Sequence, residues 1–180
     1  QRNSSAGPNP NANTNHMLLG AMSRTNNTPI NYFNGWMDEL RIWNTALSTE
    51  QIREMMNQEI ENNTAIRGSV LGLDVAGLNW SNLDAYYQMN QGTADIAAGY
   101  LVGNVGVSGR LSNITSLQEE SAPLPYISAN SGNWDTANTW LNGTVQMTPN
   151  TNNVDWNIVR TSHNINSGNR TTTLLGLLVD

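Results

Sequence analysis

Residues 32–43 alternate between the two faces of an extended chain, which leaves few folds open to this sequence. Leu40 and Ile42 share one parity with Asp38, so a strand would turn these three side chains to one face. We expect Leu40 and Ile42 to face a core. Asp38 would then need hydrogen-bond partners, because a buried carboxylate without them is costly. The pattern predicts a strand over 32–43 in a sheet that is packed on one side.

A helix start follows this run. Ser48 is a favourable N-cap residue, and Gln51 occupies the third helical position, as in a capping box. Leu47 and Ile52 occupy the two positions of a hydrophobic staple. The spacing of the apolar residues predicts a helix within 48–60 that packs on the strand. Its packing face would consist of Ile52, Met55, Met56 and Ile60.

The rest of the chain is typical of β structure with many loops. Only 12% of the 180 residues are charged, so neutral Asn, Thr, Ser and Gly residues must supply the polar surface. Asn and Gly favour turns, and Thr favours strands. Residues 92–109 are rich in Gly and indicate a loop. Short apolar runs predict strands at 16–22, 69–75, 83–89, 111–117, 156–160 and 174–179.

Composition also excludes several classes of protein. The chain has no Cys, so neither a disulfide nor a thiolate metal site can form. Its net charge of −6 gives no electrostatic reason to expect nucleic acid or an anionic lipid surface as a partner. No apolar run approaches the roughly 18 residues that a membrane span requires. The first residues are polar, so we expect no signal peptide among them.

One segment carries a family resemblance. Residues 32–48 read YFNGWMDELRIWNTALS, and residues 18–21 read LLGA. These segments resemble the closing strands of laminin-G-like domains, which belong to the concanavalin A-like jelly-roll class. The shared pattern is an aromatic residue, a Gly, an Asp-Glu pair, an apolar-Arg-apolar strand, an Asn and a Leu-Ser helix start. The motif and helix cap comprise Gly35, Asp38, Leu40, Ile42, Ser48 and Gln51.

The resemblance implies an all-β chain: a partial jelly roll, or β-sandwich, with one short helix, then an irregular β-rich segment. A jelly roll needs many more residues than the matching segment holds, so the chain is expected to be an internal fragment. The expected divisions are a disordered lead (1–15), the C-terminal part of a jelly roll (16–66), a β-rich connecting segment (67–121), a Pro-containing linker (122–130) and a further β module (131–180). The segment 67–121 loosely resembles the opening of a second such domain, and 131–180 the start of a β-solenoid.

Patterns of catalytic residues are missing from the sequence. The two His residues, His16 and His163, lack the spacing of a zinc site, and no nucleophile elbow accompanies His163. Asp38 and Glu39 are adjacent in a predicted strand, so they would point to opposite faces and could not flank one glycosidic bond. We therefore predict that this chain is not an enzyme.

A calcium site needs several oxygen atoms that converge on one point. Candidate oxygens occur in predicted loops, but no calcium-loop motif connects them, so the metal is left unknown. The candidates are Asp95, Asn104, Asp135, Asn152 and Asp155.

Trp134 and Trp140 are the candidate ligand-binding residues. Both lie among Asn, Asp and Thr residues. An exposed indole ring stacks on the apolar face of a sugar while neighbouring amides bind its hydroxyls. The alternative is that both rings fill a small β core. The sequence leaves both interpretations open.

Three functions fit these observations. The first is a non-catalytic adhesive or carbohydrate-binding module of a large secreted or cell-surface bacterial protein. Such family members bind glycans or cell-surface proteins, commonly with calcium nearby. The second is a structural spacer between neighbouring domains of the same polypeptide. The third is an ancillary region of a polysaccharide-degrading enzyme.

Overall fold

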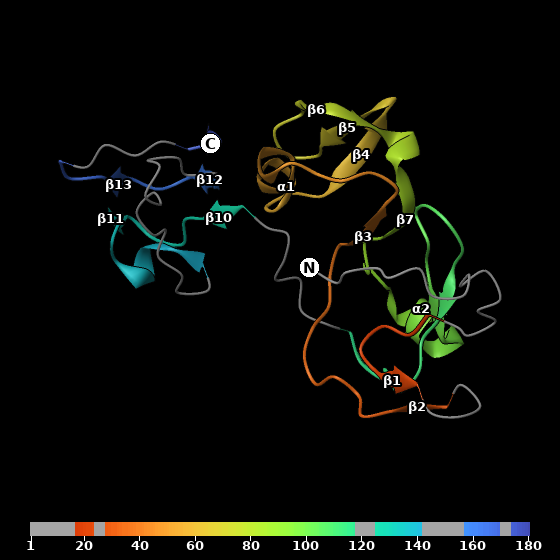
Figure 1. Cartoon of the computed structure of the whole chain (residues 1–180). Coiled ribbons are helices and arrows are strands. Elements are labelled where there is room, and N and C mark those ends of the chain that lie inside the picture. Colours follow the sequence, from red (N-terminus) through yellow and green to blue (C-terminus); the bar gives the residue numbers. More distant parts are fainter. Residues whose placement is uncertain (1–16, 24–27, 118–124, 142–156, 170–173) are drawn as a thin grey trace. The chain divides into compact units, whose positions relative to one another are not determined.

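The computed structural model describes residues 17–23, 28–117, 125–141, 157–169 and 174–180 (Figure 1). The described chain is mostly β, as predicted, and divides into two compact units, residues 1–37 and 38–180. Some predictions fall outside the described residues. These are the lead at 1–15, His16, Asn152, Asp155, residues 122–124 of the predicted linker and position 156 of a predicted strand.

The unit 1–37 contains one short antiparallel pair. β1 (Met22–Ser23) pairs with β2 (Pro29–Ile30), so the strand predicted at 16–22 is displaced to its last residue and the next one. The Phe33 N–H donates to the Gly20 carbonyl at 2.7 Å. The Phe33 ring lies over Gly35, where a Cβ atom would come within 2.7 Å of the ring. Gly35 is therefore required for this local packing.

The long strand predicted at 32–43 is wrong in its extent. Only β3 (Leu40–Trp43) is a strand, and residues 31–39 are irregular. The break has a local cause, because Glu39 adopts a φ of 51°, a left-handed conformation that interrupts an extended chain. The Asp38 carboxylate accepts a hydrogen bond from the Glu39 N–H at 2.9 Å. This bond satisfies the requirement for a partner that we expected at Asp38.

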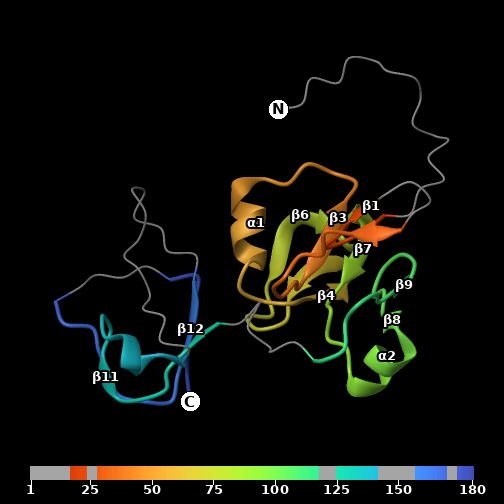
Figure 2. The same ribbon diagram turned by 90° about the horizontal axis from the view of Figure 1, so that it is seen from below.

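α1 (Thr49–Met55) begins at the predicted cap. The Gln51 N–H donates to Ser48 Oγ at 3.2 Å, and the Ser48 N–H donates to Gln51 Oε1 at 2.8 Å. The capping box is therefore confirmed. Gln51 Nε2 also donates to the Ala76 carbonyl at 2.9 Å, which ties the helix start to β6 (Asp74–Asn79), the strand that lies beside α1 in Figure 2.

Replacing Ser48 with Ala should lower the free energy of unfolding by about 0.5–2 kcal/mol, because the cap hydrogen bond is lost. Chemical denaturation measures this difference. Ser69→Ala is the matched control, since Ser69 is exposed in a turn. Equal losses in the two variants would show that the cap does not stabilise the helix start.

α1 is shorter than predicted, and its packing face differs from the expected one. Met55 is buried, but Ile52 and Met56 are each 52% exposed, so the packing predicted for these two residues is wrong. Side chains bind carbonyls that the helix end leaves without an intrahelical partner. Gln58 Nε2 donates to the Glu54 carbonyl at 2.7 Å, for example.

An antiparallel sheet follows α1 and contains β4 (Ile60–Asn63), β5 (Ala65–Gly68) and β6. Asn62 and Asn63 thus lie in a hairpin with Thr64, whose φ is 69°. Residues 69–73 form the connection from β5 to β6, so the strand predicted at 69–75 is mostly wrong. A strand after position 82 is confirmed as β7 (Leu83–Tyr87), which pairs antiparallel with β3.

The main core of the unit 38–180 lies between these strands and α1. It is apolar except for the Tyr86 hydroxyl, and Trp43, Leu47, Trp80 and Val105 pack at its margin. Trp80 belongs to a 3-10 helix, η2 (Trp80–Asn82), and its ring meets that of Tyr86 edge to face. The buried members are Met55, Ile60, Ile66, Val75, Leu78, Leu83 and Tyr86.

The Gly-rich stretch 92–109 holds more structure than predicted. α2 (Thr93–Ala98) is a second short helix, and it ends at Gly99 with a φ of 66°. β8 (Tyr100–Leu101) and β9 (Gly109–Arg110) then form a hairpin. A second short helix thus occurs beside the expected one, within a stretch that was predicted to be a loop, and Gly99 caps its C-terminal end. The strand predicted at 111–117 is also wrong, since these residues are largely exposed and irregular.

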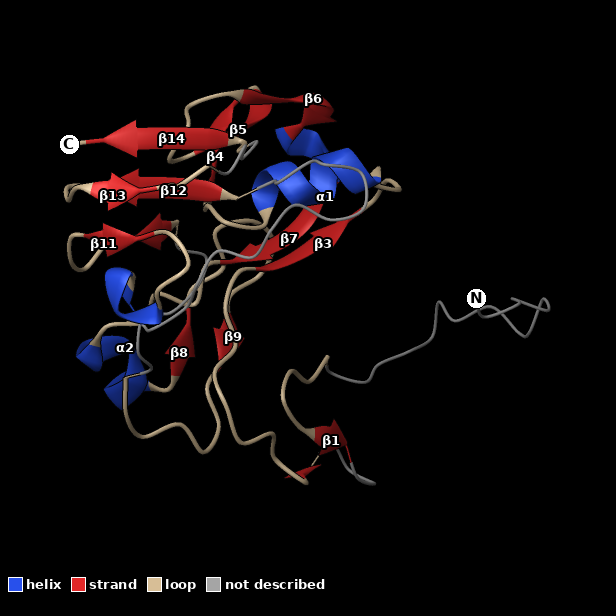
Figure 3. Cartoon of the chain, turned by 90° about the vertical axis from the view of Figure 1, so that its left-hand side faces the viewer, coloured by secondary structure: helices blue, strands red, loops and turns tan. Residues whose placement is uncertain are grey.

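Residues 125–180 contain parallel strands. β10 (Tyr126–Ile127), β12 (Ile158–Thr161) and β14 (Gly176–Val179) form one parallel sheet, as Figure 3 shows for β12 and β14. β11 (Gly132–Asn133) and β13 (Ile165–Asn166) form a second parallel pair. A 3-10 helix, η3 (Ala137–Thr139), follows β11. Short parallel strands joined by turns also occur in β-solenoids, and the start of such a module at 131–180 stays a prediction. The exact domain boundaries stay a prediction.

Candidate functional site

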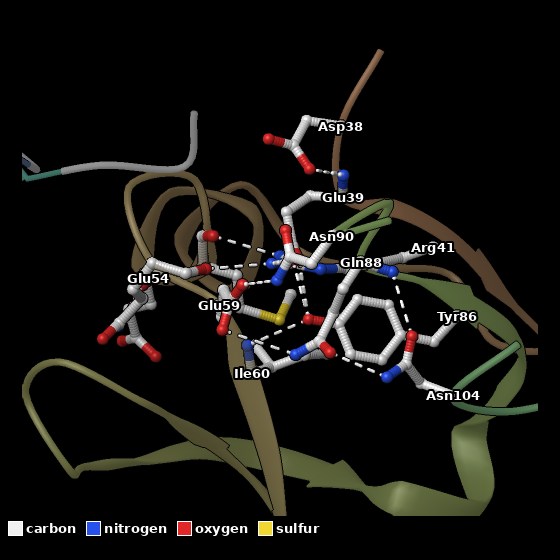
Figure 4. A network of polar contacts seen from close by, with 12 residues as sticks. Asp38, Glu39, Arg41, Glu54, Glu59, Ile60, Tyr86, Gln88, Asn90 and Asn104 are labelled. Carbon is white, nitrogen blue, oxygen red and sulfur yellow. Dashed lines mark hydrogen bonds and ion pairs between the residues drawn. The ribbon is translucent and has the colours of Figure 1, made fainter. Parts of the chain in front are cut away.

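A polar network surrounds the carboxylate of Glu39 at the start of β3 (Figure 4). The Tyr86 hydroxyl donates to Glu39 Oε1 and Oε2, at 2.9 and 2.8 Å. Arg41 Nη2 forms an ion pair with the same carboxylate. Arg41 and Tyr86 are direct partners in the β3–β7 pairing, and the guanidinium carbon lies 5.6 Å from the Tyr86 ring centroid. We call Glu39, Arg41 and Tyr86 the buried lock.

The buried lock joins four elements, β3, β7, α1 and β4. Arg41 Nη1 donates to the Met55 carbonyl at 3.0 Å, and Nη2 donates to the Gln58 carbonyl at 2.9 Å. The Ile60 N–H donates to the Tyr86 hydroxyl at 3.4 Å. The side chains of Arg41 and Glu39 are only 11% and 9% exposed. These bonds connect β3 with the end of α1 and the start of β4, so the lock has a structural role.

Burial changes the ionisation of two members of the lock. It raises the pKa of the Glu39 carboxyl above the ordinary value of 4.5, although the neighbouring Arg41 and Tyr86 lower it. Burial also raises the pKa of the Tyr86 hydroxyl, and the Glu39 carboxylate raises this pKa further. Tyr86 therefore remains a hydrogen-bond donor at neutral pH.

The raised pKa of Glu39 makes stability depend on pH in a defined direction. The folded state binds this proton more tightly, so the stabilisation is complete below pH 4.5 and is lost as pH rises through the raised pKa. We expect the free energy of unfolding of the wild type, relative to Glu39→Gln, to fall over this range. Denaturation from below pH 4.5 to neutral pH measures the difference. A difference that stays constant across the range would contradict the assignment.

An outer group of side chains lies beside the buried lock, and we call Glu59, Gln88, Asn90 and Asn104 the amide rim (Figure 4). Asn90 Nδ2 donates to Glu59 Oε1 at 2.7 Å, and Gln88 Nε2 donates to Glu59 Oε2 at 3.4 Å. Asn104 and Gln88 form two further bonds. Asn104 Nδ2 donates to Gln88 Oε1 at 2.7 Å, and the Gln88 N–H donates to Asn104 Oδ1 at 3.0 Å.

The backbone fixes the geometry of the amide rim. Met89, between Gln88 and Asn90, is buried and adopts a φ of 60°, which a non-glycine residue adopts only when its surroundings demand it. Asn90 and Asn104 are exposed, whereas Gln88 and Glu59 are half-buried. The rim is thus a fixed set of hydrogen-bonding groups that solvent can reach.

No group of three or more His, Cys, Asp or Glu side chains is placed to hold a metal within the described ranges. Among the calcium candidates, Asp95 accepts a bond from the Gly92 N–H at 3.0 Å, at the start of α2. Asn104 belongs to the amide rim, and Asp135 is exposed. Calcium binding stays a prediction.

A Ser-His contact that the sequence did not indicate occurs after β10 and β12. Ser128 Oγ lies 2.8 Å from His163 Nδ1, and it also accepts a bond from the Ser162 N–H at 3.2 Å. Ser128 is only 4% exposed, so its hydroxyl is not placed to attack a substrate. The contact therefore has a structural role between neighbouring turns.

Trp134 and Trp140 occupy the core of the C-terminal strands. They are 8% and 2% exposed, and their rings pack edge to face with the ring centroids 4.9 Å apart. Trp140 Nε1 donates to the Trp134 carbonyl at 2.8 Å, and Val159 completes the buried cluster. The two rings cover each other, which agrees with the small β core that the sequence left open beside an exposed stacking surface. Sugar binding by these residues stays a prediction.

The laminin-G-like motif residues have mainly structural positions. Gly35 packs against the Phe33 ring, and the Asp38 carboxylate accepts a hydrogen bond from the Glu39 N–H. Ser48 and Gln51 cap α1. Leu40 and Ile42 are half-buried in β3, where they oppose Tyr87 and Ala85. Within the same segment, Tyr32, Phe33 and Trp36 are 46%, 58% and 60% exposed.

Sequence reasoning missed the buried lock and the amide rim. Gln58 was missed as well; it is 2% exposed, and its Oε1 accepts bonds from the Val70 and Leu71 N–H groups at 3.2 and 3.1 Å. The available signal was weak: a charged pair at Glu39 and Arg41, two positions apart, beside an apolar run. The partners at Tyr86, Asn90 and Asn104 lie far along the chain, and no local pattern links them.

Comparison with known proteins gives a family match over the first part of the chain. Residues 1–53 match the family model described as the concanavalin A-like lectin/glucanases superfamily, of the laminin-G type. The predicted laminin-G-like segment is thereby confirmed. The match includes residues 1–15, which we expected to form a lead, and it ends before position 66. The searches of curated proteins and of solved structures each gave no match.

Proposed function

We propose that this chain, whose first 53 residues carry a laminin-G-like segment, is a non-catalytic carbohydrate-binding or adhesive module of a secreted or cell-surface protein. The match to a lectin/glucanase superfamily is the observation that carries the proposal. The fold of this superfamily serves carbohydrate-binding and structural roles, and some of its members are glycosidases. Whether this chain binds or cleaves a glycan must therefore be judged from its own residues.

The contacts of the Glu39 carboxylate favour glycan binding over glycan hydrolysis as the function. A glycosidase needs two carboxyl groups that face one glycosidic bond, with room for the sugar between them. Glu39 is instead held by Arg41 and by both hydrogen bonds from Tyr86. Its carboxylate has fixed internal partners and little exposed surface, so it is poorly placed to act as an acid or nucleophile.

The composition of the chain supports a glycan-facing role. No described helix is long and apolar enough to cross a membrane. The chain is acidic overall and rich in neutral amides, and side-chain amides are well suited to bind hydroxyl groups. Glycans present many hydroxyls, so they are the class of ligand that this surface fits.

A structural spacer is the second candidate. One observation favours it: residues 38–110 form antiparallel strands with two helices, whereas 126–179 form parallel strands. A chain that contains two architectures suits a connection between different surface domains. An ancillary region of a polysaccharide-degrading enzyme would bind a glycan without cleaving it.

Glycan-array binding of the purified chain, together with a reducing-end assay on the same glycans, tests the proposal. We expect binding to at least one glycan class and no release of reducing ends. A folded chain that binds no glycan would overturn the proposal in favour of the spacer. Release of reducing ends would show that the chain is an enzyme.

A further inference from the structure

We propose that the amide rim binds uncharged sugars through their hydroxyl groups, an inference that rests on the proposed function and assigns it to a site. The rim gathers Glu59 before β4, Gln88 and Asn90 after β7, and Asn104 between β8 and β9. Its members come from three separate parts of the chain. Their amide and carboxylate groups meet where solvent reaches Asn90 and Asn104.

The hydrogen-bond pattern of the rim selects hydroxyls. Asn90 Nδ2 and Gln88 Nε2 each donate to a different oxygen of Glu59. Each carboxylate oxygen can accept further bonds, and each amide nitrogen carries a second N–H. A sugar hydroxyl both donates and accepts, so one hydroxyl can donate to Glu59 while a neighbouring hydroxyl accepts from Asn90.

The same pattern disfavours two other ligands. A cation would meet the two N–H donors that point at the Glu59 carboxylate, and no three-ligand acidic cluster accompanies it among the described residues. A sugar acid would bring its carboxylate next to Glu59, and like charges in close contact repel. Uncharged sugars avoid both costs.

The rim is also fixed before any ligand arrives. The positive φ of Met89 sets the backbone between Gln88 and Asn90. Two bonds hold the Asn104 amide against Gln88, one from the Gln88 backbone N–H and one to the Gln88 side-chain oxygen. Binding to groups that are already ordered loses less conformational entropy, and this raises affinity.

The test uses the full chain and hexasaccharides of glucose, mannose, xylose and galacturonic acid, with affinities measured by calorimetry. We expect a neutral hexasaccharide to bind more tightly than the galacturonic acid probe. Asn90→Ala and Asn104→Ala should each weaken that binding about three- to tenfold, the value of one lost hydrogen bond. Asn130→Ala is the matched control, an exposed Asn whose amide also donates a bond, to the Asn138 carbonyl. It should leave affinity unchanged.

Glu59→Gln tests the charge argument. It keeps the size of the side chain and removes its charge, so the galacturonic acid probe should gain affinity relative to the neutral probe. In the wild-type chain, the neutral probe should shift the side-chain amide NMR signals of Gln88, Asn90 and Asn104. This second readout does not depend on whether a variant folds.

The outcomes separate this inference from the proposed function. Binding by the wild type that is equal in the Asn90 and Asn104 variants, with no shift of the rim signals, would overturn the inference and leave the function intact. Failure of every glycan on the array to bind would overturn the function itself. Preferential binding of the galacturonic acid probe at the rim would overturn the uncharged ligand class.

Discussion

Arg41→Ala should lower the free energy of unfolding by about 3–5 kcal/mol, because it leaves the Glu39 carboxylate buried without its cation. The change also removes the donors to the Met55 and Gln58 carbonyls, at the end of α1. Both effects fall on the junction between β3, α1 and β4. Denaturant unfolding, followed by tryptophan fluorescence, measures the loss.

Arg67→Ala is the matched control for Arg41→Ala. Arg67 pairs with Asp74 at 3.5 Å, and their side chains are 38% and 50% exposed. An exposed pair of this kind contributes about 0–1 kcal/mol. The double variant Arg41→Ala, Glu39→Gln should recover part of the loss, since it no longer buries a charge. Equal losses for Arg41→Ala and Arg67→Ala would show that the buried lock does not stabilise the fold.

The parts of the fold that local sequence determines were predicted well. Ser48 and Gln51 lie three positions apart, and their mutual hydrogen bonds need nothing beyond that turn of helix. The strand near 158 follows from a short apolar run that a parallel sheet buries, and Ile158 and Val159 are fully buried. The strand near 176 follows from a second apolar run, although Leu177 and Val179 are 56% and 72% exposed. Such signals act within a few residues of one another, so a single sequence reveals them.

The parts that depend on distant residues could not be predicted. The left-handed backbone at Glu39 shortens the expected strand, yet nothing in the alternation of residues 32–43 marks it. Glu39 is held there by Tyr86, from a strand that is remote in sequence. The amide rim has the same origin, because Glu59 meets Asn90 only after β4 and β7 have been placed.

The two tryptophans show why residue type alone did not decide their role. A Trp among Asn and Thr residues suits both a sugar platform and a small core. The choice depends on what covers the ring, and here Trp134, Trp140 and Val159 cover one another. Trp36 shows the reverse, because nothing covers its ring to the same extent and it is 60% exposed.

Trp140→Ala should lower the free energy of unfolding by about 3–5 kcal/mol, the usual cost of removing a buried aromatic side chain. Trp140 is 2% exposed and packs edge to face on Trp134. It belongs to a cluster separate from the one around Tyr86. Hydrogen exchange should therefore show lost protection in β12 and β14 and retained protection in β7.

Two further variants separate packing from hydrogen bonding at Trp140. Trp140→Phe keeps an aromatic ring but removes the donor to the Trp134 carbonyl, so about 1–3 kcal/mol should be lost through that unsatisfied group. Trp36→Ala removes the same side chain from an exposed position and should change stability by no more than about 0.5 kcal/mol. Equal losses in Trp36→Ala and Trp140→Ala would mean that the parallel strands do not depend on this core. A loss in Trp140→Phe as large as in Trp140→Ala would assign the stability to the indole N–H, because the ring would then add nothing by packing.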